Sequence, residues 1–414
     1  MLYSAYEMQK TMLAGASALA HLGAEWMTNP VNPMAHTRFG PVVASGFDVF
    51  AHASAPRGKP AFGLDSTIVD GRTVAVTEEI VLRKAFGQLK RFRRAGVEGA
   101  PKLLIVAPMS GHYATLLRGT VERMLPAHDV YITDWRDAKQ VPLSEGTFDL
   151  DDYVDYLVAF LEAMSADGSG RAHMLAVCQP SVPAYAAAAL MAADGHPARP
   201  ATLTLMGGPV DTREAPTSVN TVATQRPHAW FEQNVIATVP YYYPGGGRRV
   251  YPGFLQLTGF MAMNLGNHLV SHYDMFKHLV AGDGDSADSS KAFYDEYRSV
   301  CDMSAEFYLQ TIDLVFQQHA LPKGEYFHRG RRVDPAAITD IGLLAIEGER
   351  DDISGIGQTK AALTLATALP ETHRQYLMAE GVGHYGIFNG RRWREKIAPV
   401  VEGWIAQHGG QPAA

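Results

Sequence analysis

Residues 171–183 read Arg-Ala-His-Met-Leu-Ala-Val-Cys-Gln-Pro-Ser-Val-Pro, and this stretch decides the fold. The apolar run that ends at Val177 predicts a buried strand, and the Ala- and Tyr-rich run after Pro180 predicts a helix. Cys178 stands at the turn between them, where a nucleophile elbow holds its reactive side chain. The residues two before and two after it, Ala176 and Pro180, are compact enough for such a sharp turn.

The position of Cys178 also bears on its reactivity. At a helix N-terminus, the positive end of the helix dipole and the free backbone N–H groups stabilise a thiolate. The backbone N–H of Gln179 would then point at an oxyanion formed beside the sulfur. Taken alone, the same cysteine could equally be a small buried hydrophobic residue, so the interpretation depends on its partners.

Short apolar runs alternate with helical stretches from Pro101 onward. This alternation predicts βαβ units and a mostly parallel sheet flanked by helices, an α/β fold. The strands are expected at residues 102–107, 129–135, 171–177, 201–206, 340–346 and 373–378. The helices between them are expected at residues 114–125, 152–164, 184–193 and 359–368.

A long aromatic-rich segment, residues 212–333, interrupts the alternation. It predicts a mainly helical cap inserted over the carboxyl edge of the sheet. The core is therefore expected in two parts, residues 101–211 and 334–408, followed by a tail at 409–414.

Residues 1–100 are expected to form an N-terminal extension. Its small-residue stretch 11–24 favours a packed helix, with a signal peptide as the alternative. A charged helix is expected over residues 77–95. The basic run 90–94 is interpreted as a solvated face of that helix, with a polyanion site as the alternative.

Two polar loops follow the later strands and supply partners for the cysteine. Loop 347–352 offers a carboxylate at Asp351, and loop 380–386 offers an imidazole at His384. The acid would fix the imidazole tautomer, and the imidazole would take the proton of the nucleophile. The chain order of Cys178, acid and histidine is the order of the α/β-hydrolase fold, which we therefore predict.

Two details of this site have alternatives. Asp352 is the alternative to Asp351, which we prefer because it lies three residues after Gly348 in a G-x-x-D turn. A second oxyanion donor is expected in the loop after the first core strand. The backbone N–H of Met109 is the first choice, and that of Ser110 is the second.

The sequences V-C-Q-P-S-V-P around Cys178, G-E-R-D-D-I around Asp351 and G-V-G-H-Y-G-I-F around His384 resemble the intracellular polyhydroxybutyrate depolymerases. The Y-x-x-D-W-R segment at residues 131–136 fits the same family. The resemblance implies an α/β-hydrolase with a Cys-Asp-His triad that falls on these three residues. It also implies a cytoplasmic enzyme, associated with polyhydroxybutyrate granules, that cleaves the ester bonds of poly(3-hydroxybutyrate).

The resemblance implies a covalent acyl-thioester as the intermediate. Water would release 3-hydroxybutyrate or oligomers, and the thiol of coenzyme A is an alternative acceptor that would release 3-hydroxybutyryl-CoA. A polyester synthase-like acyltransferase is a second interpretation, although such synthases carry G-x-C-x-G where this chain has Ala176 and Pro180. A non-catalytic granule-binding protein is a third.

An apolar polymer needs a groove that leads to the thiol, and the cap is rich in aromatic residues. Trp230, Tyr241 and Tyr242 are the expected substrate-binding residues. Phe231 and Tyr251 are further cap aromatics that either line this path or pack in the cap itself.

The composition of the chain limits the kinds of partner and cofactor that we expect. The 414 residues include 36 basic and 43 acidic side chains, a net charge of −7, which argues against a nucleic-acid partner. Cys178 and Cys301 are too few for a disulfide framework, and no run approaches the roughly 18 apolar residues of a membrane span. No metal is expected, because His268 and His272 lack the glutamate of a metalloprotease motif. No organic cofactor is expected either, and homo-oligomerisation is left open.

Overall fold

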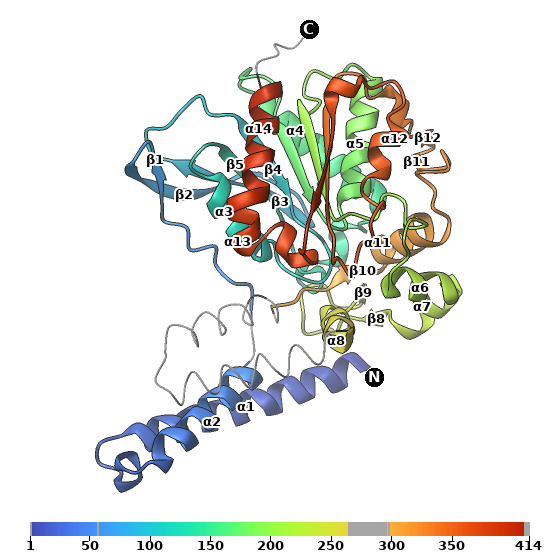
Figure 1. Cartoon of the computed structure of the whole chain (residues 1–414). Helices are drawn as coiled ribbons and strands as arrows, with labels where there is room; N and C mark the ends of the chain where they lie inside the picture. Colours follow the sequence, from blue (N-terminus) through green and yellow to red (C-terminus); the bar gives the residue numbers. More distant parts are fainter. Residues whose placement is uncertain (1, 56–57, 264–295, 297–298, 410–414) are drawn as a thin grey trace.

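The structure is a computed structural model that describes residues 2–55, 58–263, 296 and 299–409 (Figure 1). Its main element is a nine-stranded sheet with the order β1-β2-β3-β5-β4-β6-β7-β13-β14. The strands from β5 to β14 run parallel, and β1, β2 and β3 add antiparallel pairs at one edge. The strands are β1 (Ser66–Val69), β2 (Arg72–Arg83), β3 (Gly87–Arg94), β4 (Lys102–Val106), β5 (Asp129–Trp135), β6 (His173–Val177), β7 (Thr202–Met206), β13 (Gly342–Gly348) and β14 (Arg374–Ala379).

The parallel part of the sheet agrees with the sequence prediction. Each of the six predicted strands is present within two residues at either end. All residues of β5, β6, β7 and β13 are buried, as expected for central parallel strands that are covered on both faces. The α/β-hydrolase fold class is thereby confirmed.

Helices cover both faces of the sheet (Figure 1). On one face α3 and α14 are joined by the Arg123–Glu402 ion pair, and on the other α4 packs beside α5. Tyr185 of α5 also donates a hydrogen bond to a carbonyl of α12. These helices are α3 (Arg118–Met124), α4 (Leu150–Ser165), α5 (Ser181–Ala193), α12 (Ala361–Leu365) and α14 (Ala398–His408).

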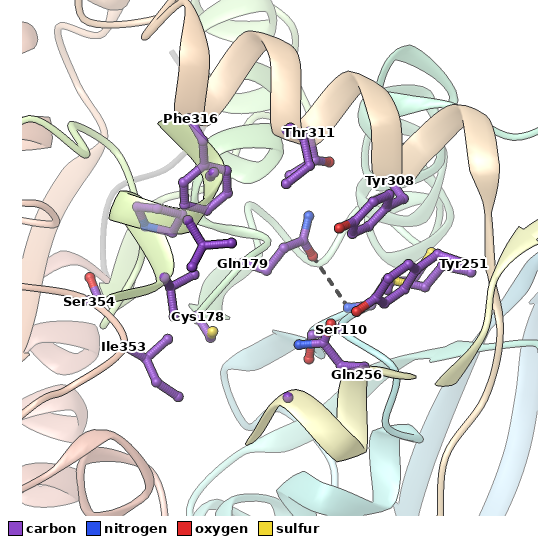
Figure 2. Close-up of a pocket in the computed structure, with 18 of the residues that line it drawn as sticks. Ser110, Cys178, Gln179, Tyr251, Gln256, Tyr308, Thr311, Phe316, Ile353 and Ser354 are labelled. Atoms are coloured by element: carbon purple, nitrogen blue, oxygen red, sulfur yellow. Dashed lines mark hydrogen bonds between the residues drawn. The ribbon is translucent and has the colours of Figure 1, made fainter. Parts of the chain in front are cut away.

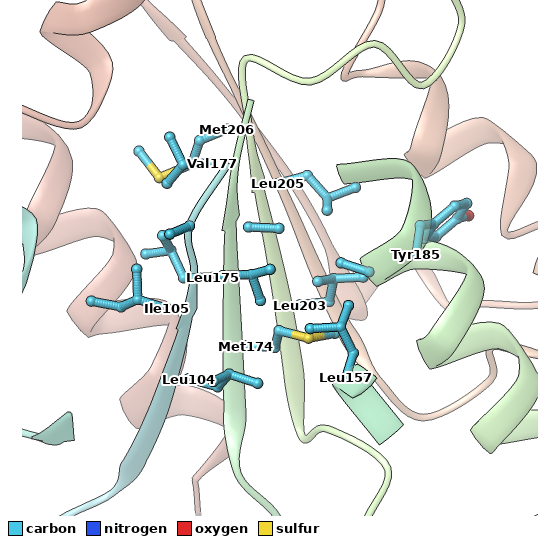
Figure 3. Close-up of a cluster of buried hydrophobic side chains, with 14 of the residues drawn as sticks. Leu104, Ile105, Leu157, Met174, Leu175, Val177, Tyr185, Leu203, Leu205 and Met206 are labelled. Atoms are coloured by element: carbon cyan, nitrogen blue, oxygen red, sulfur yellow. The ribbon is translucent and has the colours of Figure 1, made fainter. Parts of the chain in front are cut away.

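The core lies between the central strands and the helices (Figure 3). Leu104, Met174 and Leu203 lie side by side on one face of three adjacent strands and are buried, and Leu157 of α4 belongs to the same cluster. Burial of each leucine side chain contributes about 1.5–3 kcal/mol, so this layer fixes the sheet whose strand ends carry the polar loops.

The charged helix predicted over residues 77–95 is wrong. These residues form β2 and β3, an antiparallel hairpin that pairs with β5 and extends the main sheet. The β-branched residues Val74, Val76 and Ile80 favour a strand, and the charges lie on it as cross-strand pairs, which we mistook for a helix face. The domain division at residue 100 stays a prediction, although three strands before it belong to the sheet.

The basic run at residues 90–94 is not a solvated helix face. The Lys90 ammonium lies 2.6 Å from Glu78, and the Arg91 guanidinium lies 2.9 Å from Asp129. Arg94 donates to two backbone carbonyls and is buried. These pairings stabilise the edge of the sheet. Because Lys90, Arg91 and Arg94 already have partners, the run does not favour a polyanion site.

The segment before the sheet is a helical hairpin of α1 (Leu2–Thr28) and α2 (Phe39–Ser54) that projects from the body of the molecule (Figure 1). Ser17 donates a 2.7 Å hydrogen bond to the Ala51 carbonyl between the two helices. Many apolar side chains on the hairpin are exposed: Met8, Met12, Leu19, Leu22, Trp26, Phe39, Phe47 and Phe50. Within the described residues, no helix is long and apolar enough to cross a bilayer.

The described part of the predicted cap contains helices and a small sheet. The helices are α6 (Ser218–Gln225), α7 (His228–Asn234), α8 (Gly253–Met263), α11 (Ala305–Gln310) and a π-helix (Thr311–Gln317). The sheet pairs β9 (Arg249–Tyr251) with β8 (Ala237–Thr238) and β10 (Met303–Ser304). Residues 264–295 of the cap and 410–414 of the tail lie outside the described residues, and the boundaries of both segments stay predictions.

Gly208, in the loop after β7, allows the sheet to approach the start of α5. A Cβ atom at this position would lie 1.8 Å from Ser181 Oγ and 2.9 Å from the Cys178 carbonyl oxygen. We predict that Gly208→Ala lowers the free energy of unfolding by about 1–3 kcal/mol, as overpacking does. Gly403→Ala in α14, where a Cβ meets nothing within 4 Å, should instead stabilise by about 0.5–1 kcal/mol. Urea denaturation of both variants measures the difference, and equal effects would contradict this account.

Candidate active site

Cys178 occupies a strained turn directly after β6. Its φ angle is +66°, a left-handed conformation that costs a non-glycine residue about 1–3 kcal/mol. Two backbone hydrogen bonds hold the turn: Cys178 N donates to the Met206 carbonyl at 2.7 Å, and Ser181 N donates to the Cys178 carbonyl at 3.1 Å. The strain therefore lies at the one residue whose side chain must leave the sheet, as the predicted elbow requires.

Asp351 and His384 lie against each other, each at the end of its strand. His384 Nδ1 is 2.7 Å from Asp351 Oδ2, and the two side chains are 4% and 1% exposed. The other carboxylate oxygen, Oδ1, accepts hydrogen bonds from the backbone N–H groups of Ile353 and Ser354 at 2.9 and 2.8 Å. Asp352 is exposed, and Asp351 is the carboxylate that contacts the imidazole.

The electrostatics of His384 connect it to the cysteine. Burial lowers the pKa of His384, but the Cys178 sulfur and the Asp351 carboxylate raise it by more, through their charge and through hydrogen bonds. The net result is a pKa well above the ordinary 6.5 of histidine. Cys178 and Asp351 together therefore favour the protonated form of the His384 imidazole.

The loop after β4 places Met109 beside Gln179. Its start is held at the Ala107 carbonyl, which accepts hydrogen bonds from Trp135 Nε1 at 2.9 Å and from the Tyr153 hydroxyl at 3.1 Å. Met109 N donates at 3.3 Å to the side-chain oxygen of Gln179. The two residues predicted as oxyanion donors thus lie side by side next to Cys178. The Met109 N–H, however, already donates to the Gln179 side chain.

A cavity of about 400 Å³ opens beside the thiol (Figure 2). Cys178, Gln179 and Met109 line one part of it, and the described part of the cap supplies aromatic walls. None of the described residues that line it carries a charge. The cavity therefore suits an uncharged, largely apolar ligand.

The aromatic lining differs from the sequence prediction. Trp230, Tyr241 and Tyr242 do not line this cavity, and the tyrosines are 88% and 69% exposed. The aromatic residues that do line it are Phe231, Tyr251, Phe307, Tyr308 and Phe316. The residues from 307 onward were missed because their helices carry no motif, and only their aromatic content distinguishes them.

The second cysteine is unlike the first. Cys301 is buried, and its Sγ contacts the His112 carbonyl at 3.5 Å. Burial and the nearby carboxylates Asp137 and Asp302 raise the pKa of the Cys301 thiol well above its ordinary value, which keeps it protonated. His268 and His272, on which we based the expectation of no metal, lie outside the described residues.

The second half of the chain decides the family. A family model described as PHB de-polymerase C-terminus matches residues 207–409. This half of the chain belongs to the polyhydroxybutyrate depolymerase family. The depolymerase domain contains the loops of Asp351 and His384 and begins after Cys178. The resemblance seen in the sequence is thereby confirmed, and the protein is a carboxylic ester hydrolase.

Solved structures similar to this one are distant in sequence. An esterase of Thermogutta terrifontis is 12% identical, with 83% of this chain and 97% of that chain covered and a TM-score of 0.40. The naproxen esterase of Bacillus subtilis is 14% identical, with 81% and 92% covered and a TM-score of 0.45. The 2-hydroxy-6-oxo-6-phenylhexa-2,4-dienoate hydrolase of Rhodococcus sp. strain RHA1 is 12% identical, with 80% and 99% covered and a TM-score of 0.44. No curated protein sequence matches the chain.

The raised pKa of His384 gives a test of the site. The imidazolium should persist above pH 6.5, so the NMR titration midpoint of His384 should lie well above that value. Cys178→Ser and Asp351→Asn should each lower the midpoint, because each weakens an interaction that raises the pKa of His384. Asp352→Asn is the matched control and should leave it nearly unchanged. A midpoint at or below 6.5 in the unmodified protein would contradict the ion pair.

Proposed function

We propose that the protein is a poly(3-hydroxybutyrate) depolymerase that uses Cys178 as nucleophile, His384 as acid and base, and Asp351 to orient the imidazole. One observation carries this proposal: the thiol on the strained elbow lies beside a buried Asp–His pair and opens into an uncharged cavity. Poly(3-hydroxybutyrate) is itself an uncharged polyester, so it complements such a cavity.

In the acylation step, the Cys178 thiolate attacks an ester carbonyl carbon and forms a C–S bond. The backbone N–H groups of Gln179 and Met109 stabilise the oxyanion. The tetrahedral intermediate then breaks its C–O bond, and the protonated His384 gives its proton to the departing alkoxide. The alcohol end of the polymer leaves, and a 3-hydroxyacyl thioester remains on the enzyme.

In the second step, neutral His384 takes a proton from water as the water attacks the thioester carbonyl. The C–S bond breaks, the thiolate returns, and 3-hydroxybutyrate or an oligomer is released. We assign water as the acceptor because the described cavity lining offers no lysine or arginine for the phosphates of coenzyme A. Transfer to coenzyme A remains an outcome that the experiment below distinguishes.

We further propose that the enzyme works in the cytoplasm at the surface of polymer granules and attaches through the α1–α2 hairpin. The hairpin exposes many apolar side chains, and large exposed apolar patches mark interaction sites. Its base is fixed beside the active-site cavity, because Tyr6 stacks on Phe254 of α8 with ring centroids 4.0 Å apart, and Gln256 of α8 lines the cavity.

The products formed from amorphous, protein-free polymer granules test the chemistry. The unmodified protein should release soluble 3-hydroxybutyrate or its oligomers without coenzyme A, and Cys178→Ala should reduce the rate by at least about 10³-fold. Cys301→Ala controls for removal of a thiol and should retain activity. If no product is released without coenzyme A, and 3-hydroxybutyryl-CoA is released when coenzyme A is added, water is not the acceptor.

Two further outcomes of the same assay would contradict depolymerisation. Polymer formation from 3-hydroxybutyryl-CoA would indicate the synthase-like acyltransferase. Granule binding with no release of product by either the unmodified protein or Cys178→Ala would indicate a non-catalytic granule-binding protein.

Attachment through the hairpin has its own test. Leu19→Glu and Leu22→Glu, at side chains that are 72% and 60% exposed, should each weaken co-sedimentation with granules by about tenfold, because each removes apolar area from the contact. Hydrolysis of the soluble ester p-nitrophenyl butyrate should be unchanged. Ile68→Glu in β1, at a residue 62% exposed, is the matched control and should bind granules normally. Unchanged granule binding combined with a change from oligomer to monomer would contradict the proposal and favour a second copy as the partner.

A further inference from the structure

Two polar groups in the active-site cavity have no hydrogen-bond partner. The side-chain nitrogen Nε2 of Gln179 and the hydroxyl of Ser354 are both buried, and neither has a partner among the described residues. Both residues line the cavity beside Cys178. A buried donor left unpaired costs about 1–3 kcal/mol, so such groups need an explanation.

The two groups lie on either side of the nucleophile. Figure 2 shows Ser354 on one side of Cys178 and Gln179 on the other. Ser354 is fixed by its backbone N–H, which donates to Asp351 Oδ1 at 2.8 Å. The Gln179 carboxamide is oriented by its side-chain oxygen, which accepts from Met109 N at 3.3 Å. Two unpaired donors therefore flank the atom that attacks the ester.

The unpaired atoms match the hydrogen-bonding groups of a linear polyester. Such a polymer carries one carbonyl acceptor in each repeat and no donor along its chain. Cleavage uses one carbonyl at the oxyanion donors and leaves the carbonyls of the neighbouring repeats in need of partners. A monoester has no neighbouring carbonyl, so it cannot use further donors.

We propose that Gln179 Nε2 and Ser354 Oγ each bind an ester carbonyl of a repeat that flanks the scissile bond. This inference rests on the proposed function and names the feature that selects polyesters over monoesters. The carboxamide oxygen of Gln179 accepts the Met109 N–H, at the position where the scissile carbonyl would lie. Substrate binding therefore replaces that oxygen with the substrate carbonyl while Nε2 gains an acceptor.

The experiment compares kcat/KM for two soluble substrates, a methyl-capped linear trimer of 3-hydroxybutyrate and p-nitrophenyl butyrate. Ser354→Ala and Gln179→Met each remove one donor and should lower the trimer-to-monoester ratio of kcat/KM by about tenfold, mainly through KM for the trimer. Ser354→Ala should at the same time keep or raise the melting temperature, because it removes an unpaired buried hydroxyl. A purely structural role for Ser354 would lower stability instead.

Thr115→Val is the matched control. Thr115 Oγ1 is also buried without a partner, but Thr115 does not line the cavity. The substitution should keep or raise stability and leave the substrate ratio unchanged. The inference is overturned if the ratio is unchanged in both cavity variants, or if it falls as far in Thr115→Val. Failure of the unmodified protein to cleave trimer or polymer, with p-nitrophenyl butyrate still cleaved, would overturn the proposed function itself.

Discussion

The left-handed backbone at Cys178 is the constraint on which the site depends. A φ of +66° at Cys178 forms the turn between the end of β6 and the start of α5, and its side chain lines the adjoining cavity. Packing maintains this conformation: Gly208 lets β7 approach the turn, and the Met206 carbonyl accepts the Cys178 N–H. A residue held in this strained state by its neighbours is a common feature of active sites.

The electrostatics of the site follow from burial. Asp351 and His384 are almost fully enclosed, so their attraction is poorly screened, and the Asp351 carboxylate is further held by two backbone N–H groups. Charge is thus concentrated in the pair, while the adjoining cavity has no charged lining among the described residues. In the proposed mechanism, this separation is what allows a charged pair to act on an uncharged polyester.

Local sequence patterns predicted most of what positions this site. The central strands are buried on both faces, so their short apolar runs could be predicted as strands of a parallel sheet. The carboxyl ends of parallel strands meet at one edge, which brings the loops of Cys178, Asp351 and His384 together. The preference for Asp351 over Asp352 rested on a turn spacing, and the structure places Asp351 against the imidazole.

Other features depend on tertiary contacts that the sequence does not display. The strands β2 and β3 were mistaken for a helix because their charges are paired across strands, as in Lys90 with Glu78. The exposed tyrosines Tyr241 and Tyr242 were expected in the cavity, whereas Tyr308, from a helix without any motif, lines it. The contact of the Gln179 side chain with Met109 brings together residues 70 positions apart and is visible only in the structure.

The central claim is that the Cys178 sulfur carries the acyl group during turnover. Mass spectrometry of protein quenched in acid during cleavage of the polymer measures this directly. We predict a 3-hydroxybutyryl adduct on the peptide that contains Cys178, removable by hydroxylamine and absent from Cys178→Ala. An adduct on a serine of that peptide, or turnover by Cys178→Ala at the unmodified rate, would contradict it.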